Sequence, residues 1–491
     1  MVAFEPRLFE DIDPDERPSL AAALVPIAGM IVFLSVGIVA FGLDPQFPLL
    51  WGIAFTGLFA RYHLGLSWDD LYDGITDSLL MGMKVIIIMF IVYALISSWI
   101  QAGTIPGLMY YGLEFLTPAV FLPVTAILAA IISFAVGSSW TTAGALGVAF
   151  IGIGSGLGIP EPMTAGAILS GAYAGDKQSP LSDTTNLAAA VTNTDLYDHI
   201  NAMRAGTLVA FGLSVVLYTA IGLNAAGSIP AGRLASIQTA LQGSYVISPL
   251  VFLPIVVTFG LAIYGIPALP ALGTGVFAGV FTSMLVQGTG FAAAWSAAQS
   301  GTGPETGMVL VDKLLDTSGM IDGAWIVTIA IAALSLGGML ERTGILAVLA
   351  HHLGRLCRGV ASLTGVTALS AVSMNILAAE QYVSIVVPGM TLRNLYEEQG
   401  LKAKNLSRAI EASGTTTSAL IPWGSGGLFM AGTLGVSTLE YAPYYFFGFL
   451  SPLVLLIMGL TGWQIVYKEG SGADETASPG SGVGTGVPGE D

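Results

Sequence analysis

The sequence predicts an all-α polytopic membrane protein. Hydrophobic residues make up 54% of the 491 positions and charged residues only 10%, whereas soluble domains carry about 25% charged residues. The mean hydropathy is +0.77. Apolar stretches of about 20 residues recur along the chain, and each is long enough to cross a ~30 Å hydrocarbon core as a helix. We expect about ten transmembrane helices plus two re-entrant hairpins, in an inverted-topology repeat with two broken helices.

The charge balance and the cysteine content exclude several classes of site. The chain has 32 acidic and 16 basic residues, for a net charge of -16. With no basic patch to neutralise phosphates, nucleic acid is not an expected partner. The single cysteine, Cys357, excludes an intramolecular disulfide and any cysteine-rich metal site. The acidic, lysine-poor polar segments suggest adaptation to a high-salt cytoplasm.

Both ends of the chain are polar. Residues 1–19 are acidic and lack the basic region of a secretory signal, so we expect a cytoplasmic N-terminal tail. Residues 468–491 consist mostly of Gly, Ser, Pro and acids and cannot bury enough apolar surface to fold alone. They predict a disordered C-terminal tail.

Basic residues give the predicted spans a direction. Arg7 and Arg17 place the N-terminus inside. Lys84 lies at the inner end of the third span, where a lysine can extend to the interface. A multi-pass protein of the cytoplasmic membrane with both termini in the cytoplasm follows. The clear apolar spans are 20–42, 46–60, 81–101, 205–223, 247–265, 268–290, 325–341 and 443–466.

The same order of segments occurs twice. It is a span, a short amphipathic segment, two apolar arms around a polar kink, and a helix broken by polar residues. Loops beside the first kinked segment contain Glu114 and Glu161 but no Lys or Arg, whereas those beside the second contain seven basic residues. The copies therefore have opposite topology, as in many secondary transporters.

The repeat divides the predicted chain into five parts between its tails. They are N-terminal helices (20–80), the first repeat (81–204, hairpin about 120–153, broken helix about 164–190), connecting helices and an outer loop (205–324), the second repeat (325–437, hairpin about 362–393, broken helix about 409–435) and a last helix (438–467).

The arms around each kink favour re-entrant hairpins. Each arm is about 14 to 16 residues, or ~21 to 24 Å at 1.5 Å per residue, which is short for a crossing. Two full spans for each kink are the alternative, and the sidedness of the flanking loops is the same in both cases.

The first kink carries hydroxyl groups at a predicted mid-membrane turn. Ser138, Ser139 and Thr141 lie between apolar arms. Hydroxyl and freed carbonyl oxygens at a helix break can replace the hydration shell of Na+. Small polar residues are also common where helices pack, so helix packing is the alternative interpretation.

The first broken helix contains two aspartates. Pro180 removes a helix donor and should break the helix, and Ser182 or Asp183 could cap a new one. Asp176 and Asp183 are seven positions apart, about two helical turns, so both can face one cavity. A carboxylate that holds either Na+ or a proton, but not both, is the minimum site of an exchanger. Alternatively, Asp176 pairs with Lys177 and Asp183 only caps a helix.

The second copy has a matching polar set. Glu380 follows the second kink and is the other carboxylate expected near the midplane, where ionisable groups are costly and usually functional. A structural hydrogen bond is the alternative role for it. Asn375, Thr416 and Ser425 complete the candidate cation and proton contacts in this copy.

Three stretches carry a family resemblance. GSSWTTAGALGVA (137–149), GAYAGDKQSPLSDTTNLAAAVTNTDLYDHI (171–200) and IPWGSGG (421–427) resemble the NhaC-type Na+/H+ antiporter family of the ion transporter superfamily. The resemblance implies a proton-coupled antiporter that moves Na+ or Li+. It implies cation contacts at Ser138, Ser139, Thr141, Asp176, Ser179, Ser182, Asp183, Thr184 and Asn186.

The predicted function is exchange of Na+ for H+ across the cytoplasmic membrane by alternating access, in pH and salt homeostasis. An organic-acid antiporter of the malate/lactate type or an amino-acid exchanger is the alternative, with Lys177 as the basic residue at the break for a substrate carboxylate. No catalytic residue is expected, since a protease would need a second aspartate on a facing helix or a base beside a serine. Na+, H+ and the lipid bilayer are the expected partners, no cofactor is expected, and a homodimer is compatible with the sequence.

Overall fold

The computed structural model describes residues 7–225 and 232–468. Within these residues the chain forms helices, turns and two isolated β-bridges, Thr302 to Thr317 and Leu401 to Tyr467, and no strand. This confirms the predicted all-α class. The helices before the first repeat are α1 (Leu20–Leu34), continued by the π-helical η2 (Ser35–Ala40), and α2 (Gln46–Tyr62).

Seven helices in the described residues are long and apolar enough to cross a membrane, or up to nine if two bent pairs each form one span. The prediction of about ten is close to this range. The bends lie in the pairs Arg233–Ser244 with Pro249–Ile263 (88°) and Thr438–Tyr444 with Phe446–Thr461 (56°). The seven are Leu20–Ile38, Trp68–Gln101, Pro118–Val136, Leu196–Leu223, Ala268–Val286, Met320–Arg342 and Val360–Ala378.

Helices follow one another in a similar order in residues 68–191 and 320–434. A glycine with positive φ, Gly103 at 79° and Gly344 at 75°, separates the long first helix of each copy from the short one that follows. The first copy consists of α3 (Trp68–Gln101), α4 (Thr104–Phe115), α5 (Pro118–Val136), α6 (Ser139–Gly156), α7 (Glu161–Asp176) and α8 (Asp183–Val191). The second consists of α15 (Met320–Arg342), α16 (Ile345–Gly354), α17 (Val360–Ala378), α18 (Gln381–Thr391), α19 (Arg393–Glu398), α20 (Lys404–Ile410), the π-helical η4 (Glu411–Thr415), η5 (Ser418–Leu420) and α21 (Ser425–Leu434).

The two kinks have the same backbone geometry. Gly137 (φ 71°) and Ala379 (φ 55°) are left-handed, and the extended residues Ser138 and Glu380 follow them. The spacing, 379 minus 137, is 242 positions. The kinks therefore occupy equivalent places in the two copies.

Equivalent hydrogen bonds join each kinked pair to its broken helix. Ser133 Oγ donates to the carbonyl of Ala172 at 2.6 Å, and Asn375 Nδ2 donates to the carbonyl of Gly414 at 2.6 Å. These donors and acceptors also differ by 242 positions, 375 minus 133 and 414 minus 172. The two copies thus share contacts as well as helix order.

The helix arms are longer than predicted in the first copy. α5 and α6 have 19 and 18 residues, and α17 and α18 have 19 and 11. The arms extend because Pro118 lies in the first turn of α5, where a proline starts a helix rather than ending it. An 18-residue arm is about 27 Å long, so length alone does not separate a re-entrant arm from a span, and re-entry stays a prediction.

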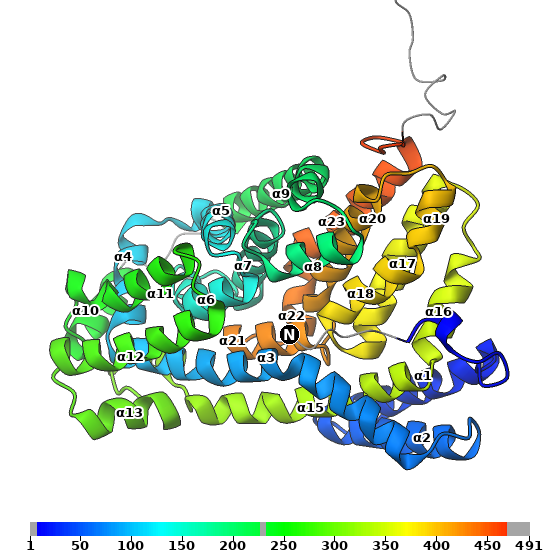
Figure 1. Ribbon diagram of the computed structural model, residues 1–491. Helices are drawn as coiled ribbons and strands as arrows, with labels where there is room; N and C mark the ends of the chain where they lie inside the picture. The colour runs from blue at the N-terminus through cyan, green and yellow to red at the C-terminus, as the bar shows by residue number, and fades with distance from the viewer. Residues whose placement is uncertain (1–6, 226–231, 469–491) are drawn as a thin grey trace, which may run out of the picture.

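The connecting and final helices complete the molecule. Figure 1 shows α3 and α15 side by side along one edge, with α5 to α9 above one end and α17 to α20 above the other. Gly338 permits the close packing of α3 on α15, because a Cβ there would lie 2.2 Å from the carbonyl oxygen of Gly74. The remaining helices are α9 (Leu196–Ala225), α10 (Arg233–Ser244), α11 (Leu253–Ile263), α12 (Ala268–Val286), α13 (Phe291–Ser300), α14 (Val309–Leu315), α22 (Thr438–Tyr441) and α23 (Phe446–Thr461).

The described part of the N-terminal tail packs on the second copy. Phe9 stacks on His351 of α16 with ring centroids 3.8 Å apart, and Ile12 is 2% exposed. The backbone N–H of Arg7 donates to Glu341 at 2.8 Å. A tail was expected from the acidic composition, which does not reveal these few apolar and aromatic anchors. The predicted disordered C-terminal tail lies outside the described residues beyond Lys468.

Candidate functional site

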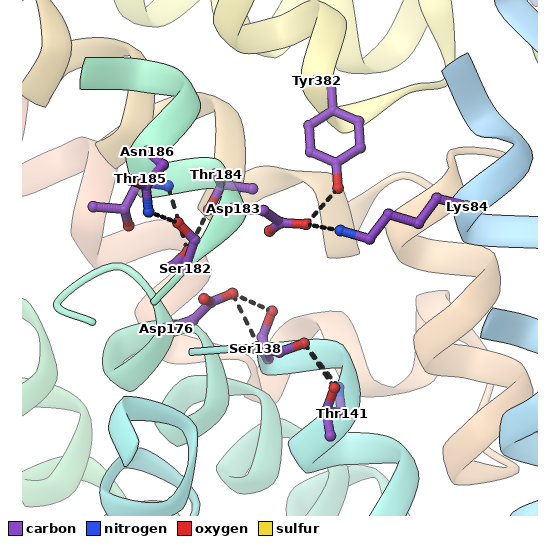
Figure 2. A network of polar contacts seen from close by, with 11 residues as sticks. Lys84, Ser138, Thr141, Asp176, Ser182, Asp183, Thr184, Thr185, Asn186 and Tyr382 are labelled. Atoms are coloured by element: carbon purple, nitrogen blue, oxygen red, sulfur yellow. Dashed lines mark hydrogen bonds and ion pairs between the residues drawn. The ribbon is translucent and has the colours of Figure 1, made fainter. Parts of the chain in front are cut away.

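A cavity of about 280 Å³ lies where the two copies meet. Four charged side chains line it: Lys84 of α3, Asp176 at the end of α7, Asp183 at the start of α8, and Glu380 before α18. Figure 2 shows Lys84, Asp176 and Asp183 converging from these separate segments. The rest of the lining is mostly apolar and includes residues 262 and 265–268, at and beside the connection from α11 to α12. Asp176 and Asp183, which the sequence placed in one cavity, both line it.

Asp183 is held by two donors from distant parts of the chain. Lys84 Nζ lies 2.6 Å from Asp183 Oδ2, and the Tyr382 hydroxyl donates to the same oxygen at 2.7 Å. The Asp183 and Lys84 side chains are 39% and 35% exposed. Lys84 was expected to extend to the membrane interface, but it pairs with Asp183 in the cavity instead. A local apolar pattern locates the lysine on its helix and cannot show a partner 99 positions away.

Asp176 is almost fully buried, at 3% exposure. It is the last residue of α7, and the helix stops before Pro180. The backbone N–H and the hydroxyl of Ser139 donate to Asp176 Oδ2 at 3.0 and 2.7 Å. Oδ1 has no hydrogen-bond partner in the described part of the chain. Asp176 does not pair with Lys177, the alternative that the sequence had left open.

Glu380 is 1% exposed and caps α18. Glu380 Oε2 accepts from the backbone N–H of Tyr382 at 3.1 Å and from the Ser425 hydroxyl at 3.4 Å. Among residues 7–225 and 232–468, its other oxygen, Oε1, has no hydrogen-bond partner. The acid therefore has a structural bond and also a free acceptor beside the cavity.

The predicted hydroxyl contacts of the first copy act largely on the backbone. Ser138 caps α6 and lines the cavity, and its Oγ accepts from the N–H of Thr141 at 3.1 Å. Ser182 is the N-cap of α8, as predicted for this position or the next. Ser179 Oγ accepts from the N–H of Leu181 at 3.3 Å, and Asn186 Nδ2 donates to the Pro180 and Ser182 carbonyls at 2.9 and 2.6 Å.

Three candidates of the second copy, Asn375, Thr416 and Ser425, do not line the cavity, and Ser425 donates to Glu380 as described above. Asn375 donates to the Gly414 carbonyl, as described above, and to Thr417 Oγ1 at 3.1 Å. Thr416 Oγ1 donates to the Ala412 carbonyl at 2.7 Å, within its own helix. Both side chains stabilise the irregular helix around η4, because their donors satisfy nearby carbonyls. Residue type and spacing predict that these side chains form hydrogen bonds, but not which groups they bond to.

A second set of buried charges lies behind the break. Lys177 is 1% exposed, and its Nζ donates to Ser451 Oγ at 3.2 Å and lies 5.5 Å from the Phe447 ring centroid. Glu411 in η4 accepts from Thr184 Oγ1 at 3.1 Å. The Glu411 side chain is fully buried, at 0% exposure. Lys177 is thus absent from the cavity lining, and the lysine in the cavity is Lys84.

Lys84 and Tyr382 are the site residues that the sequence did not assign. A lysine within an otherwise apolar span was the available signal for Lys84, because an ammonium group is costly there unless it has a partner. Tyr382 had no comparable signal, since a tyrosine beside Glu380 is also an ordinary core residue.

The chain is similar to known antiporters over most of its length. The profile of the Na+/H+ antiporter family matches residues 171–463. The chain is 56% identical over 472 residues to the arginine/ornithine antiporter ArcD of Halobacterium salinarum, covering 96% of this chain and 97% of that protein. It is 35% identical to the Na(+)/H(+) antiporter NhaC of Alkalihalophilus pseudofirmus, covering 91% and 97%. It is also 35% identical to the malate-2H(+)/Na(+)-lactate antiporter of Bacillus subtilis, covering 84% and 89%.

The family consists of multi-pass membrane transporters, not enzymes. This multi-pass chain therefore belongs to the Na+/H+ antiporter family.

Proposed function

We propose that this antiporter exchanges cationic amino acids of the arginine and ornithine class across the cytoplasmic membrane. The observation that carries the proposal is the cavity between the two copies, lined by three carboxyl groups and one lysine. The amino-acid exchanger was an alternative in the sequence analysis, and the size and charge of this cavity make it the first candidate.

The volume suits a small organic molecule better than a bare ion. The cavity holds about 280 Å³, close to the lower end of the ~300–1,000 Å³ typical of ligand pockets. A water molecule occupies about 30 Å³ in the liquid, so a dehydrated Na+ would leave most of this space unfilled.

The charges suit a molecule with two positive groups and one negative group. Asp183, Asp176 and Glu380 can accept from ammonium or guanidinium groups, and Lys84 can donate to a carboxylate. Arginine and ornithine carry this combination at neutral pH. A relative with 56% identity that is named for these two substrates supports the same class.

Contacts between the two copies are the basis for proposing exchange by alternating access. α8 of the first copy meets α18 of the second through Asp183 and Tyr382. Trp140 of α6, which lies 242 positions before Tyr382, stacks on Phe429 of α21 at 4.3 Å, so the corresponding pair of helices is also in contact. We propose that one of these contacts opens while the other closes, so that the cavity faces one side at a time.

The test is exchange in vesicles. Purified protein is placed in liposomes loaded with ornithine, and uptake of labelled arginine is measured. We expect uptake that depends on internal ornithine and is lost in Asp183→Asn. Asp198→Asn is the matched control, because Asp198 pairs with Lys404 at 3.9 Å away from the cavity lining. Absence of arginine and ornithine exchange in wild-type protein would exclude this function.

Exchange of Na+ for H+ is the second candidate. It is favoured by the buried, unpartnered oxygens of Asp176 and Glu380 among the described residues, since hard cations bind oxygen. The same vesicles, with a pH-sensitive dye inside, give the test. A Na+ gradient that moves protons without any amino acid would favour this candidate over the first.

A further inference from the structure

We propose that the Lys84–Asp183 pair binds the α-carboxylate and α-ammonium groups of the substrate, while Asp176 and Glu380 bind the positive end of its side chain. The inference rests on the proposed function and deepens it, because it assigns each charge of the substrate to a residue. It also makes Lys84 the residue that separates amino acids from simple cations.

The Lys84–Asp183 pair presents two opposite charges to the cavity. The two groups are 2.6 Å apart, and both side chains stay more than one third exposed. An α-amino acid carries an ammonium and a carboxylate on the same carbon atom. It can exchange the single ion pair for two, with its ammonium on Asp183 and its carboxylate on Lys84. A cation without a carboxylate would satisfy Asp183 and leave Lys84 without a counter-charge.

Two features hold Asp183 in place while its ion-pair partner changes from Lys84 to the substrate. Ser182 caps α8, which fixes the backbone of Asp183 at the first position of that helix. The Tyr382 hydroxyl also donates to Asp183 Oδ2 at 2.7 Å. The carboxylate therefore keeps a donor and its position while Lys84 turns to the substrate.

The same cavity also offers carboxylate oxygens without donors. Asp176 Oδ1 and Glu380 Oε1 are buried atoms of cavity-lining residues and lack hydrogen-bond partners within residues 7–225 and 232–468. A buried acceptor without a donor is destabilising, so a ligand that donates to it is favoured. A guanidinium group carries five N–H donors in a fixed plane and can satisfy two carboxylates at once.

Two analogues of arginine test the two parts of the assignment separately. Agmatine is arginine without its carboxylate, and citrulline has an uncharged urea group in place of the guanidinium. We expect wild-type protein to bind arginine at least about tenfold more tightly than either analogue, the ratio that one lost ion pair of about 1.4 kcal/mol produces.

Lys84→Met tests the assignment of the carboxylate. Binding is measured by competition with labelled arginine on purified protein. We expect the affinity for arginine to fall by about tenfold or more and that for agmatine to be kept or to rise, because agmatine has no carboxylate for Lys84 to bind and competes with Lys84 for Asp183. Lys404→Met is the matched control, because Lys404 forms its ion pair with Asp198 at 3.9 Å and does not line the cavity.

A double variant distinguishes loss of a binding contact from loss of folding. Lys84→Met leaves Asp183 without its ion-pair partner, whereas Lys84→Met with Asp183→Asn removes both charges. The double variant, eluting as a single species in size-exclusion chromatography, should lose the preference for arginine over agmatine. A retained preference would overturn the inference.

The outcomes separate the inference from the proposed function. If wild-type protein binds arginine and agmatine equally, or if Lys84→Met weakens both equally, the head-group assignment is wrong and amino-acid exchange still stands. If wild-type protein binds neither arginine nor ornithine, the proposed function fails and the inference fails with it.

Discussion

At the scale of single residues, the buried pair Lys177 and Glu411 shows how this molecule keeps charge within its helices. Each is at most 1% exposed, and each has a hydroxyl partner, Ser451 or Thr184. Opposite charges in such an interior attract each other over a longer range than in water, because they are weakly screened there. A charge in such a place is stable while its counter-charge is present and destabilising once that counter-charge is removed.

We therefore expect the two residues to be energetically coupled. Lys177→Met and Glu411→Gln should each lower the half-unfolding temperature in detergent. The double variant should be less destabilised than the sum of the two, with a coupling free energy of about 0.5–3 kcal/mol. Strictly additive effects would show that the two charges do not stabilise each other.

At the scale of elements, the packing of α5 on α7 depends on glycine. Gly171 and Gly175 lie one turn apart on α7, and a Cβ at these positions would lie 2.0 and 2.1 Å from the carbonyl oxygens of Ala126 and Ala130. These are backbone atoms of α5, which cannot move aside as a flexible side chain can. Small residues at helix contacts of this kind let backbones approach closely within membranes. The packing also positions Asp176, the next residue after Gly175.

Gly175→Ala should separate the two helices. We expect a loss of about 1–3 kcal/mol in stability, the range for overpacking, and a loss of exchange because Asp176 moves. Gly273→Ala in α12 is the control, since a Cβ there meets nothing within 4 Å. That variant should keep its half-unfolding temperature or gain the ~0.5–1 kcal/mol that alanine brings to a helix. Equal behaviour of the two variants would contradict the packing argument.

At the scale of the whole molecule, the two copies meet through a pair of equivalent contacts around one cavity. Trp140 stacks on Phe429, and Tyr382 bonds to Asp183. Each contact joins the kinked pair of one copy to the second half of the broken helix of the other. The proposed alternating access predicts that a rearrangement exposing the cavity to the opposite side changes these contacts.

Holding the Trp140–Phe429 contact closed should stop transport. Cys357 is the single native cysteine, so Cys357→Ser provides a clean background for Trp140→Cys with Phe429→Cys. We expect a short bifunctional methanethiosulfonate reagent to abolish ornithine-driven arginine uptake and a reductant to restore it. Each single-cysteine variant should keep its uptake after the same treatment. Full uptake by the bridged protein would show that this contact stays closed throughout the cycle.

Much of the fold and part of the site follow from local sequence. The all-α membrane class came from composition and from apolar stretches whose length matches a bilayer. The break at Pro180 and the cap at Ser182 came from backbone chemistry that acts over a few residues. Asp176, Asp183 and Glu380 stood out because carboxylates are rare within apolar helices.

The sequence by itself thus determined the class of the protein, its two copies and the acids at their breaks, because hydropathy, proline and helix caps act locally. Only the tertiary structure decided that Lys84 and Tyr382 meet at Asp183, 99 and 199 positions away from it. It also decided that Lys177 donates to Ser451 and does not line the cavity. Which side chains meet depends on how distant helices pack, and similar local patterns are compatible with many packings.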